Sequence, residues 1–283
     1  VPIARRPYVE PHSRHDLGHM TVACPHCQAF HWMDERLSSS SNSRPLFGIC
    51  CDQDQVRLPQ LRHPPPYLQQ LFESQTPEAI GFQSNIRQYN AGLAFTSLGV
   101  DVDHAVNVGR GPHVFRIHGE LCHRIGHIMP SEGRHPVYAQ LYIYDPRIAL
   151  DERMQRNENL CRRTMERLQT LLLQNHRYAA IFQHAHEILA NQPDDSPITI
   201  RLLADPSRDR RRYNLPTVDE IAAVIPGDEA ESTGSRDIVL HRREGPLQRI
   251  SDGHRSYACL HYVLLFPYGE DGWHYELQMH QPS

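Results

Sequence analysis

The sequence predicts an α+β protein in which a small N-terminal cysteine module precedes a mixed α/β domain. Four of the seven cysteines fall between residues 24 and 51. Apolar residues recur at helical spacing through residues 150–174 and 177–190, which predicts two long helices. Short apolar runs between glycine- and proline-containing turns predict strands elsewhere. A chain of 283 residues is long enough for one or two domains with a substantial core.

Composition divides the chain into four predicted segments. The first is rich in proline, arginine and histidine, which indicates an extended arm. The second contains the clustered cysteines, and a proline-rich linker separates it from the third. The predicted segments are residues 1–20 (arm), 21–63 (cysteine module), 64–227 (mixed α/β domain with the two long helices) and 228–283 (C-terminal strands).

The cysteine module has the spacing of a metal site. Cys24 and Cys27 form a C-x2-C sequence, which brings two thiolates together on one tight turn. Cys50 and Cys51 return after a loop and can complete a tetrahedral zinc site. We therefore predict a zinc-knuckle module in which these four cysteines hold a structural zinc ion.

Other arrangements of the module remain open. Cys50 and Cys51 are adjacent, so both can face one metal only if the backbone bends sharply. Alternatively, a histidine supplies the fourth ligand, or Cys24 and Cys27 form a disulfide, or the thiols stay unlinked. No N-terminal apolar run resembles a signal peptide, which argues against the oxidising compartment that a disulfide requires. The candidate histidines are His15, His19, His26 and His31.

The first half of the larger domain combines predicted helices and strands. Residues 67–72 and 78–89 carry apolar side chains at helical spacing. Alternating or uninterrupted apolar runs, bounded by turn residues, predict short strands. These strands are predicted at residues 54–59, 92–98, 114–118, 126–129 and 138–144.

The second half begins with the two long helices. Their predicted core faces consist of Leu160, Met165, Leu168, Leu171 and Leu172 in the first, and Ile181, Ala185, Ile188 and Leu189 in the second. Residues 216–225 predict another helix, with Thr217 as its N-cap and acidic residues in its first turn. Apolar runs predict strands at residues 198–203, 238–241 and 259–266.

The absence of lysine excludes two kinds of chemistry. The sequence contains no lysine, so all 29 basic residues are arginine, and the net charge is −4. A P-loop and a Schiff-base enzyme both need a lysine, so neither is encoded in its usual form. Arginine binds phosphate bidentately and stacks on bases, which suits nucleic-acid binding, although compositional bias is an alternative explanation. No apolar run reaches the roughly 20 residues that span a bilayer, so we expect a soluble, intracellular protein.

One local sequence is a candidate for phosphate binding. Four arginines within five positions, followed by a tyrosine, could clamp a DNA backbone and stack a base. The alternative is a solvated turn in which nearby aspartates pair with the arginines. The predicted nucleic-acid-binding residues are Arg208, Arg210, Arg211, Arg212 and Tyr213.

Distinctive sequence blocks follow one another along the chain. They are CPHCQAFHWMDER (residues 24–36), FGICC (47–51), VRLP (56–59), NIRQYN (85–90), AFTSLG (94–99), FRIHG (115–119), AQLYI (139–143), RRYNLP (211–216) and LLFPYGEDGW (264–273). In this order they resemble the N-terminal region of the Rep/helicase proteins of Helitron transposons. The resemblance covers residues 15–274.

The resemblance implies a role in rolling-circle DNA transposition. Full-length proteins of this family join a relaxase-type nuclease to an ATP-dependent helicase, and the catalytic motifs lie downstream of the block at residues 264–273. Since this sequence ends at Ser283, we expect a DNA-recognition region without its own catalytic motifs. The expected partners are single-stranded DNA or transposon ends and the downstream nuclease and helicase domains. The expected location is the nucleus.

Two alternatives to this function are a metal-dependent relaxase-type single-strand nuclease and an inactive, transposon-derived interaction fragment. The nuclease would use His184 and His186 as a metal pair and Tyr138 and Tyr142 as nucleophiles. Residues i and i+2 of a helix diverge by about 200°, so two histidines on a predicted helix cannot share a metal. The two tyrosines lie on a predicted strand, where a Tyr-x3-Tyr pair does not have its helical geometry. We therefore favour the non-catalytic interpretation.

A second histidine group is a weaker metal candidate. His118, His123 and His127 lie near Cys122, and a spacing of four on a helix could bind zinc. Two glycines weaken a helix there, and twenty histidines in one chain make chance clusters common. We favour core or surface histidines.

Overall fold

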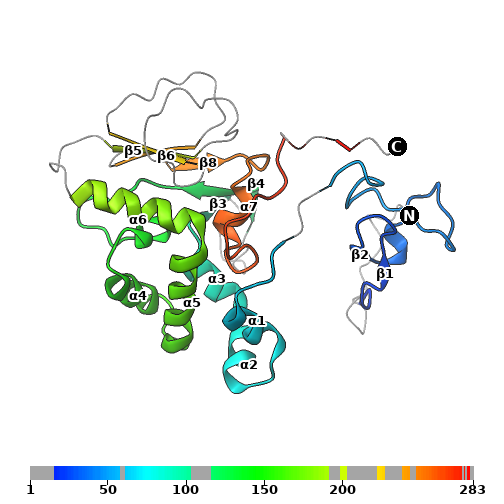
Figure 1. The fold of residues 1–283 in the computed structure, drawn as a ribbon, viewed down its shortest axis with the longest axis horizontal. Coiled ribbons are helices and arrows are strands. Elements are labelled where there is room, and N and C mark those ends of the chain that lie inside the picture. The colour runs from blue at the N-terminus through cyan, green and yellow to red at the C-terminus, as the bar shows by residue number, and fades with distance from the viewer. Residues whose placement is uncertain are drawn as a thin grey trace, which may run out of the picture. The chain divides into compact units, whose positions relative to one another are not determined.

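The computed structural model describes residues 16–57, 61–102, 116–190, 198–202, 222–226, 238–242, 247–275, 277 and 279–280. The chain is a mixed α+β protein with an N-terminal four-cysteine cluster, helices and small antiparallel sheets (Figure 1). It divides into two compact units, residues 1–59 together with 277–283, and residues 60–276. No helix within the described ranges is both long and apolar enough to cross a membrane.

The smaller unit has little regular structure. Strands β1 (Val22–Ala23) and β2 (Phe30–His31) form an antiparallel pair, and the 3-10 helix η2 (Met33–Glu35) follows. Among its described residues, the buried apolar cluster consists of Cys24, Phe47 and Cys51, and the half-buried Val22 and Cys50 pack against it. So small a core cannot stabilise a fold of this length without a cross-link or a metal.

Seven α-helices are described in the larger unit, together with the 3-10 helix η4 (Tyr138–Tyr142). Pro66 and Pro77 stand in the first turns of α1 and α2, where their missing N–H groups are not needed. The helices are α1 (Pro66–Glu73), α2 (Pro77–Ser84), α3 (Ile86–Leu93), α4 (Pro146–Gln155), α5 (Arg162–Asn175), α6 (Arg177–Ala190) and α7 (Tyr257–His261).

Two three-stranded antiparallel sheets accompany the helices. One has the order β3-β4-β8 and the other the order β6-β5-β7. Backbone hydrogen bonds from Ile128 to His241 and from Met129 to Arg242 connect the segment after β4 to the end of β7. The strands are β3 (Ser97–Val102), β4 (Ile117–Ile125), β5 (Ile198–Leu202), β6 (Ala222–Pro226), β7 (Ile238–His241) and β8 (Gln248–Ile250).

The core of the larger unit is one apolar cluster to which all seven described helices and both three-stranded sheets contribute. The predicted apolar face of α5 is buried, including Met165 and Leu168, and so is the face of α6 at Ile181 and Ala185. Helix α6 lies along the sheet that contains β5 and β6 (Figure 1). The long-helix predictions are therefore confirmed where their periodicity is strongest.

Two predicted elements have the wrong type. Residues 259–266 are not a strand but the end of α7 and the turns that follow it. An uninterrupted apolar run does not distinguish a strand from a buried helix. Residues 222–225 are not helical, because β6 pairs with β5 and places Val224 opposite Ile200. Residues 216–221 of that predicted helix, with Thr217, lie outside the described residues.

Residues 138–142 form η4 instead of the predicted strand. The Val137 N–H donates to Oε1 of Gln140 at 3.0 Å, which closes the first turn. Tyr138 has φ +50°, a left-handed conformation that an extended strand cannot contain.

Several predicted boundaries also shift. A break at Asn85 divides the predicted helix at 78–89 into α2 and α3, and a turn divides residues 150–174 between α4 and α5. Helix α4 starts early because the Asp145 carboxylate caps it by accepting the Arg147 N–H at 2.8 Å. The other shifted predictions are the strands at 54–59 (a turn in its described part), 92–98 (β3 begins at 97), 114–118 (β4 begins at 117) and 126–129 (irregular).

A buried arginine connects its own helix to three other helical segments of the core. Arg153 of α4 is 2% exposed, and burial lowers the pKa of its guanidinium. Its Nε donates to the Gly92 carbonyl at 3.0 Å, and its Nη1 donates to Oε1 of Gln169 at 2.7 Å. The guanidinium also lies 5.0 Å from the centre of the Tyr142 ring. This side chain therefore ties α4 to α5, to the end of α3 and to η4.

We expect Arg153→Ala to destabilise the larger unit by about 3 kcal/mol, because it leaves two buried acceptors without donors and opens a cavity. Urea unfolding followed by circular dichroism measures this change. Arg147→Ala, at an exposed position of the same helix, should stay within about 0.5 kcal/mol of the wild type. Equal effects of the two variants would contradict the role assigned to Arg153.

Candidate metal centre

The first cysteine pair lies on the turn between β1 and β2. The Cys24 N–H donates to the Ala29 carbonyl at 2.8 Å, and the Gln28 N–H donates to the Cys24 carbonyl at 3.1 Å. Gln28 has φ +64°, which reverses the chain directly after Cys27. Against the effect of burial, the backbone amides of Cys27 and His26 lower the pKa of the Cys24 thiol. The turn therefore holds the first two thiols in place and directs amide dipoles at one of them.

The backbone bends sharply directly after Cys50 and Cys51, as it must if both are to face one metal ion. Asp52, Gln53 and Asp54 all have positive φ, at 45°, 56° and 74°. The Asp54 N–H donates to Cys51 Sγ at 3.3 Å, and the Val56 N–H donates to the Cys51 carbonyl at 2.9 Å. A left-handed conformation costs about 1 kcal/mol or more for each non-glycine residue, so this bend needs a compensating interaction.

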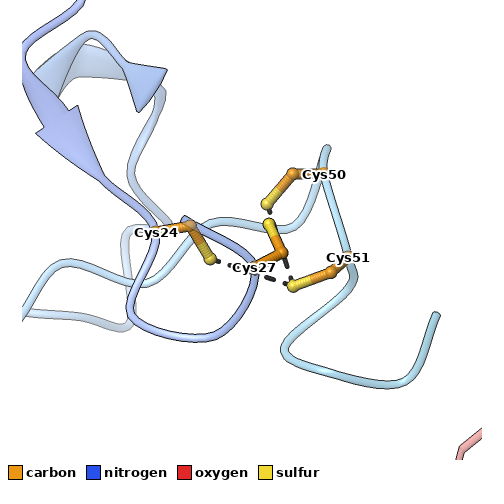
Figure 2. Close-up of side chains that lie close together, drawn as sticks. All are labelled: Cys24, Cys27, Cys50 and Cys51. Carbon is orange, nitrogen blue, oxygen red and sulfur yellow. Dashed lines mark hydrogen bonds between the residues drawn. The ribbon is translucent and has the colours of Figure 1, made fainter. Parts of the chain in front are cut away.

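The four sulfurs converge on one point (Figure 2). All four Sγ atoms lie within 4.8 Å of one another. Cys24 Sγ lies 3.8 Å from Cys51 Sγ, and Cys50 Sγ lies 4.0 Å from Cys51 Sγ. Zinc–sulfur bonds of about 2.3 Å in a tetrahedron place the sulfurs about 3.8 Å apart. The cluster fits a structural zinc ion held by Cys24, Cys27, Cys50 and Cys51.

The environment shifts the pKa values of Cys24, Cys50 and Cys51 in different directions. Burial raises the pKa of Cys24, but hydrogen bonds from the Cys27 and His26 amides and from neighbouring thiols lower it more, to about 7. Burial raises the pKa of Cys50 to about 12 and also raises the pKa of Cys51. Several adjacent thiolates repel one another, so full ionisation of the cluster needs a bound cation.

The alternative histidine ligands do not join the cluster. His31 lies flat against Phe47, with ring centres 4.0 Å apart, and its Nδ1 contacts Glu35 Oε2 at 2.9 Å. His19 and His26 are exposed and do not belong to the group of converging ligand atoms. His15 lies outside the described residues. Within the described ranges, no other group of three or more Cys, His or acidic side chains converges as these cysteines do.

Arg208, Arg210, Arg211, Arg212 and Tyr213 lie outside the described residues, so their role stays a prediction.

The alternative catalytic groups lack the geometry of a nuclease site. His184 and His186 lie on α6, as predicted, where His184 pairs with Glu187 at 3.5 Å and His186 is exposed. The Tyr142 hydroxyl is buried and donates to the Leu93 carbonyl, whereas Tyr138 is 40% exposed. The histidine pair and the tyrosine pair therefore do not form a shared centre.

The second histidine group lies on a strand. His123 of β4 is buried between the rings of Tyr257 and His261, at centre distances of 4.0 and 4.1 Å. Burial, together with the nearby His261, lowers the pKa of His123 to about 4. The His118 side chain is not among those described, and His127 lines a cavity. His123 is therefore a core residue.

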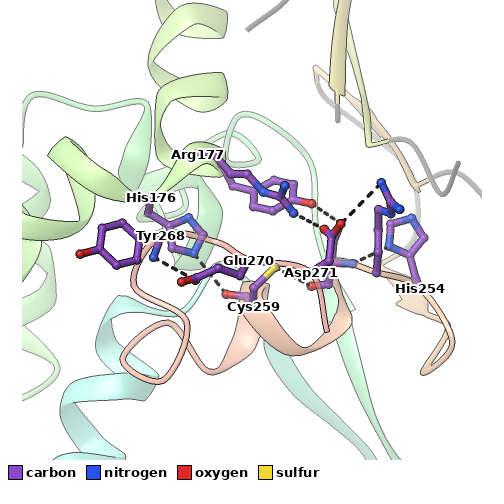
Figure 3. A network of polar contacts seen from close by, with 10 residues as sticks. His176, Arg177, His254, Cys259, Tyr268, Glu270 and Asp271 are labelled. Carbon is purple, nitrogen blue, oxygen red and sulfur yellow. Dashed lines mark hydrogen bonds and ion pairs between the residues drawn. The ribbon is translucent and has the colours of Figure 1, made fainter. Parts of the chain in front are cut away.

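A partly buried polar network fixes the segment that carries the block at residues 264–273 (Figure 3). Arg177, the first residue of α6, pairs with Asp271, and Arg255 Nη1 lies 3.6 Å from the same carboxylate. Nε2 of His176 donates to the Cys259 carbonyl at 3.3 Å, and the His176 ring stacks on Phe95. This network anchors the block against the core of the larger unit.

Two cavities lie near η4 that the sequence did not predict. One measures about 630 Å³ and the other about 550 Å³, and Tyr138 lines both. Their walls come from segments far apart in the sequence, and no local motif marks them.

No family model matches this sequence, and no curated protein matches it either.

The zinc site predicts a specific pattern of metal loss. We expect one zinc per chain by native mass spectrometry, and we expect Cys51→Ser to lose it because three sulfurs leave the tetrahedron incomplete. Cys161→Ser changes an exposed cysteine outside the cluster and should retain the zinc. Retention in Cys51→Ser together with loss in His26→Ala or His31→Ala would assign the fourth position to a histidine.

The buried His176 predicts a pH dependence of stability. Burial lowers its pKa to about 3, below the value of about 6.5 in an unfolded chain. Between these values the unfolded state binds the extra proton, so stability is complete above about pH 6.5 and falls as the pH falls towards 3.

We expect His176→Gln, which keeps an N–H donor, to reduce the slope of unfolding free energy against pH by about 1.4 kcal/mol per unit in this window. Urea unfolding at a series of pH values measures the slope. His186→Gln, at an exposed position of α6, should leave it unchanged. An unaltered slope in His176→Gln would contradict the burial of a neutral imidazole.

Proposed function

We propose that this chain is the zinc-stabilised DNA-recognition region of a Helitron-type rolling-circle transposase/helicase. The observation that carries the proposal is the four-cysteine cluster, since the cysteines that converge are those in the first two sequence blocks of the resemblance. The region binds transposon ends or single-stranded DNA and positions the nuclease and helicase domains of the full-length protein.

Zinc has a structural role in this proposal. Four sulfurs fill a tetrahedral ion, so no position remains for a water molecule or substrate. The ion compensates the left-handed bend at residues 52–54 and the small core around Phe47. It thereby holds the turn after β1 in one conformation.

Local arginine patches supply the DNA affinity. The net charge of −4 means that the chain as a whole does not attract DNA electrostatically. Arginine is the only strong cation, and its planar group pairs with phosphate through two hydrogen bonds. Binding by such patches depends steeply on salt.

We expect the zinc-loaded chain to bind a fluorescently labelled single-stranded oligonucleotide in fluorescence anisotropy. The logarithm of the association constant should fall linearly with the logarithm of salt concentration, by about 0.7 for each phosphate contacted. The Cys161→Ser variant, which changes a cysteine outside the cluster, should bind as the wild type does.

Failure to bind single-stranded and duplex DNA even at low salt, by a folded and zinc-loaded chain, would contradict the proposal. That result would favour an interaction fragment without DNA activity.

A further inference from the structure

The two cavities beside Tyr138 differ in chemistry. The larger one lies between η4 and the end of β4, and its polar lining includes Arg124, Arg134, His127 and His135. None of the described residues that line it is acidic, and Nδ1 of His135 contacts Oε1 of Glu152 at 2.9 Å, which leaves Arg124 and Arg134 as the strong cations of the lining. Both cavities have the size of small-molecule sites, about 300 to 1,000 Å³. The larger cavity therefore suits an anionic group.

The smaller cavity is mainly apolar. Its walls include Leu98, Leu264, Leu265 and Tyr262, and Leu98 and Leu265 are 57% and 58% exposed. Thr96 and His261 are bonded to each other at 2.9 Å, so they contribute little free hydrogen-bonding capacity to it. This cavity suits a flat, largely apolar group such as a nucleobase.

Tyr138 belongs to both walls and is held in an unusual conformation. Its φ of +50° is rare for a non-glycine residue, and its side chain stays 40% exposed. Backbone conformations of this kind concentrate at binding sites, where the surrounding structure maintains them. An exposed aromatic ring between two cavities is a platform on which a base can stack.

The walls are fixed by buried contacts. Oε1 of Gln140 accepts from the Val137 N–H at 3.0 Å, and its Nε2 donates to the His127 carbonyl at 3.2 Å, which connects η4 to the opposite wall of the larger cavity. The Arg124 side chain crosses Gly99, where a Cβ atom would lie 2.3 Å from Nε. The absence of a side chain at Gly99 therefore allows Arg124 to take its place in the wall.

We propose that these paired cavities bind one nucleotide of single-stranded DNA, with its phosphate at Arg124 and Arg134 and its base beside Tyr138 in the apolar cavity. The inference rests on the proposed function and names the place on the larger unit where the strand is held. A phosphate and an attached base are the two chemistries that the adjoining cavities offer.

The test measures binding of a fluorescein-labelled oligothymidylate to the full, zinc-loaded chain over a salt series. Tyr138→Asn removes the ring but tolerates the left-handed backbone, and it should weaken binding about tenfold without changing the salt slope. Arg134→Gln should flatten the slope by about 0.7. Leu265→Glu should weaken binding through its charge, and Tyr138→Phe should retain the affinity.

Matched controls lie outside both cavities. Arg147→Gln and Ile148→Glu change exposed residues of α4 and should bind as the wild type does. Thermal unfolding by circular dichroism checks that each variant is folded. Thymidine 5′-monophosphate should displace the oligonucleotide better than inorganic phosphate, because only the nucleotide fills the apolar cavity.

Three results would contradict the inference and remain distinguishable. If the wild type binds but folded Tyr138→Asn and Arg134→Gln match their controls, the cavities are not the site and the proposed function stands. If the wild type does not bind at all, the proposed function and this inference both fail. Equal displacement by nucleotide and inorganic phosphate would exclude the base-binding role of the apolar cavity.

Discussion

The convergence of four cysteine sulfurs on one point is the constraint on which the smaller unit depends, because all four can ionise there only around a bound cation. The sulfurs lie within 4.8 Å of one another, and the apolar cluster around them contains little more than Phe47. A chain of this kind cannot hold such an arrangement through burial alone. Structural zinc contributes on the order of 10 kcal/mol to comparable modules, which exceeds the strain of the left-handed turn. We therefore expect metal binding and folding of this unit to be one process.

The larger unit is stabilised differently, by an extensive apolar core with a few buried or half-buried polar groups. Arg153 has neutral hydrogen-bond partners, whereas Arg177 and Arg255 share Asp271. In each case a long, planar side chain connects segments far apart in sequence. A lysine has fewer donors and no planar fork, so it could not make the same set of contacts. Arginine, the only strongly basic residue type in the chain, thus stabilises the larger unit and also serves the surface role that we propose.

Local patterns predicted the parts of the structure that are determined locally. The spacing of Cys24 and Cys27 indicated the turn between β1 and β2, and the periodicity around Leu168 and Ile181 indicated α5 and α6. The bend after Cys51 carried no such indication, because no glycine marks its positive φ values. Strand β6 and helix α7 were missed because the apolar residues in each range fit either structure, and tertiary pairing decides between them. The cavities beside Tyr138 combine separate segments, which no single motif can reveal.

X-ray absorption at the zinc edge tests the central claim most directly, because it reports the atoms bound to the metal. The account predicts a first shell of sulfur alone, with four scatterers at about 2.3 Å. A nitrogen or oxygen scatterer at about 2.0 Å would show that a histidine or water replaces one cysteine and would contradict the four-cysteine centre.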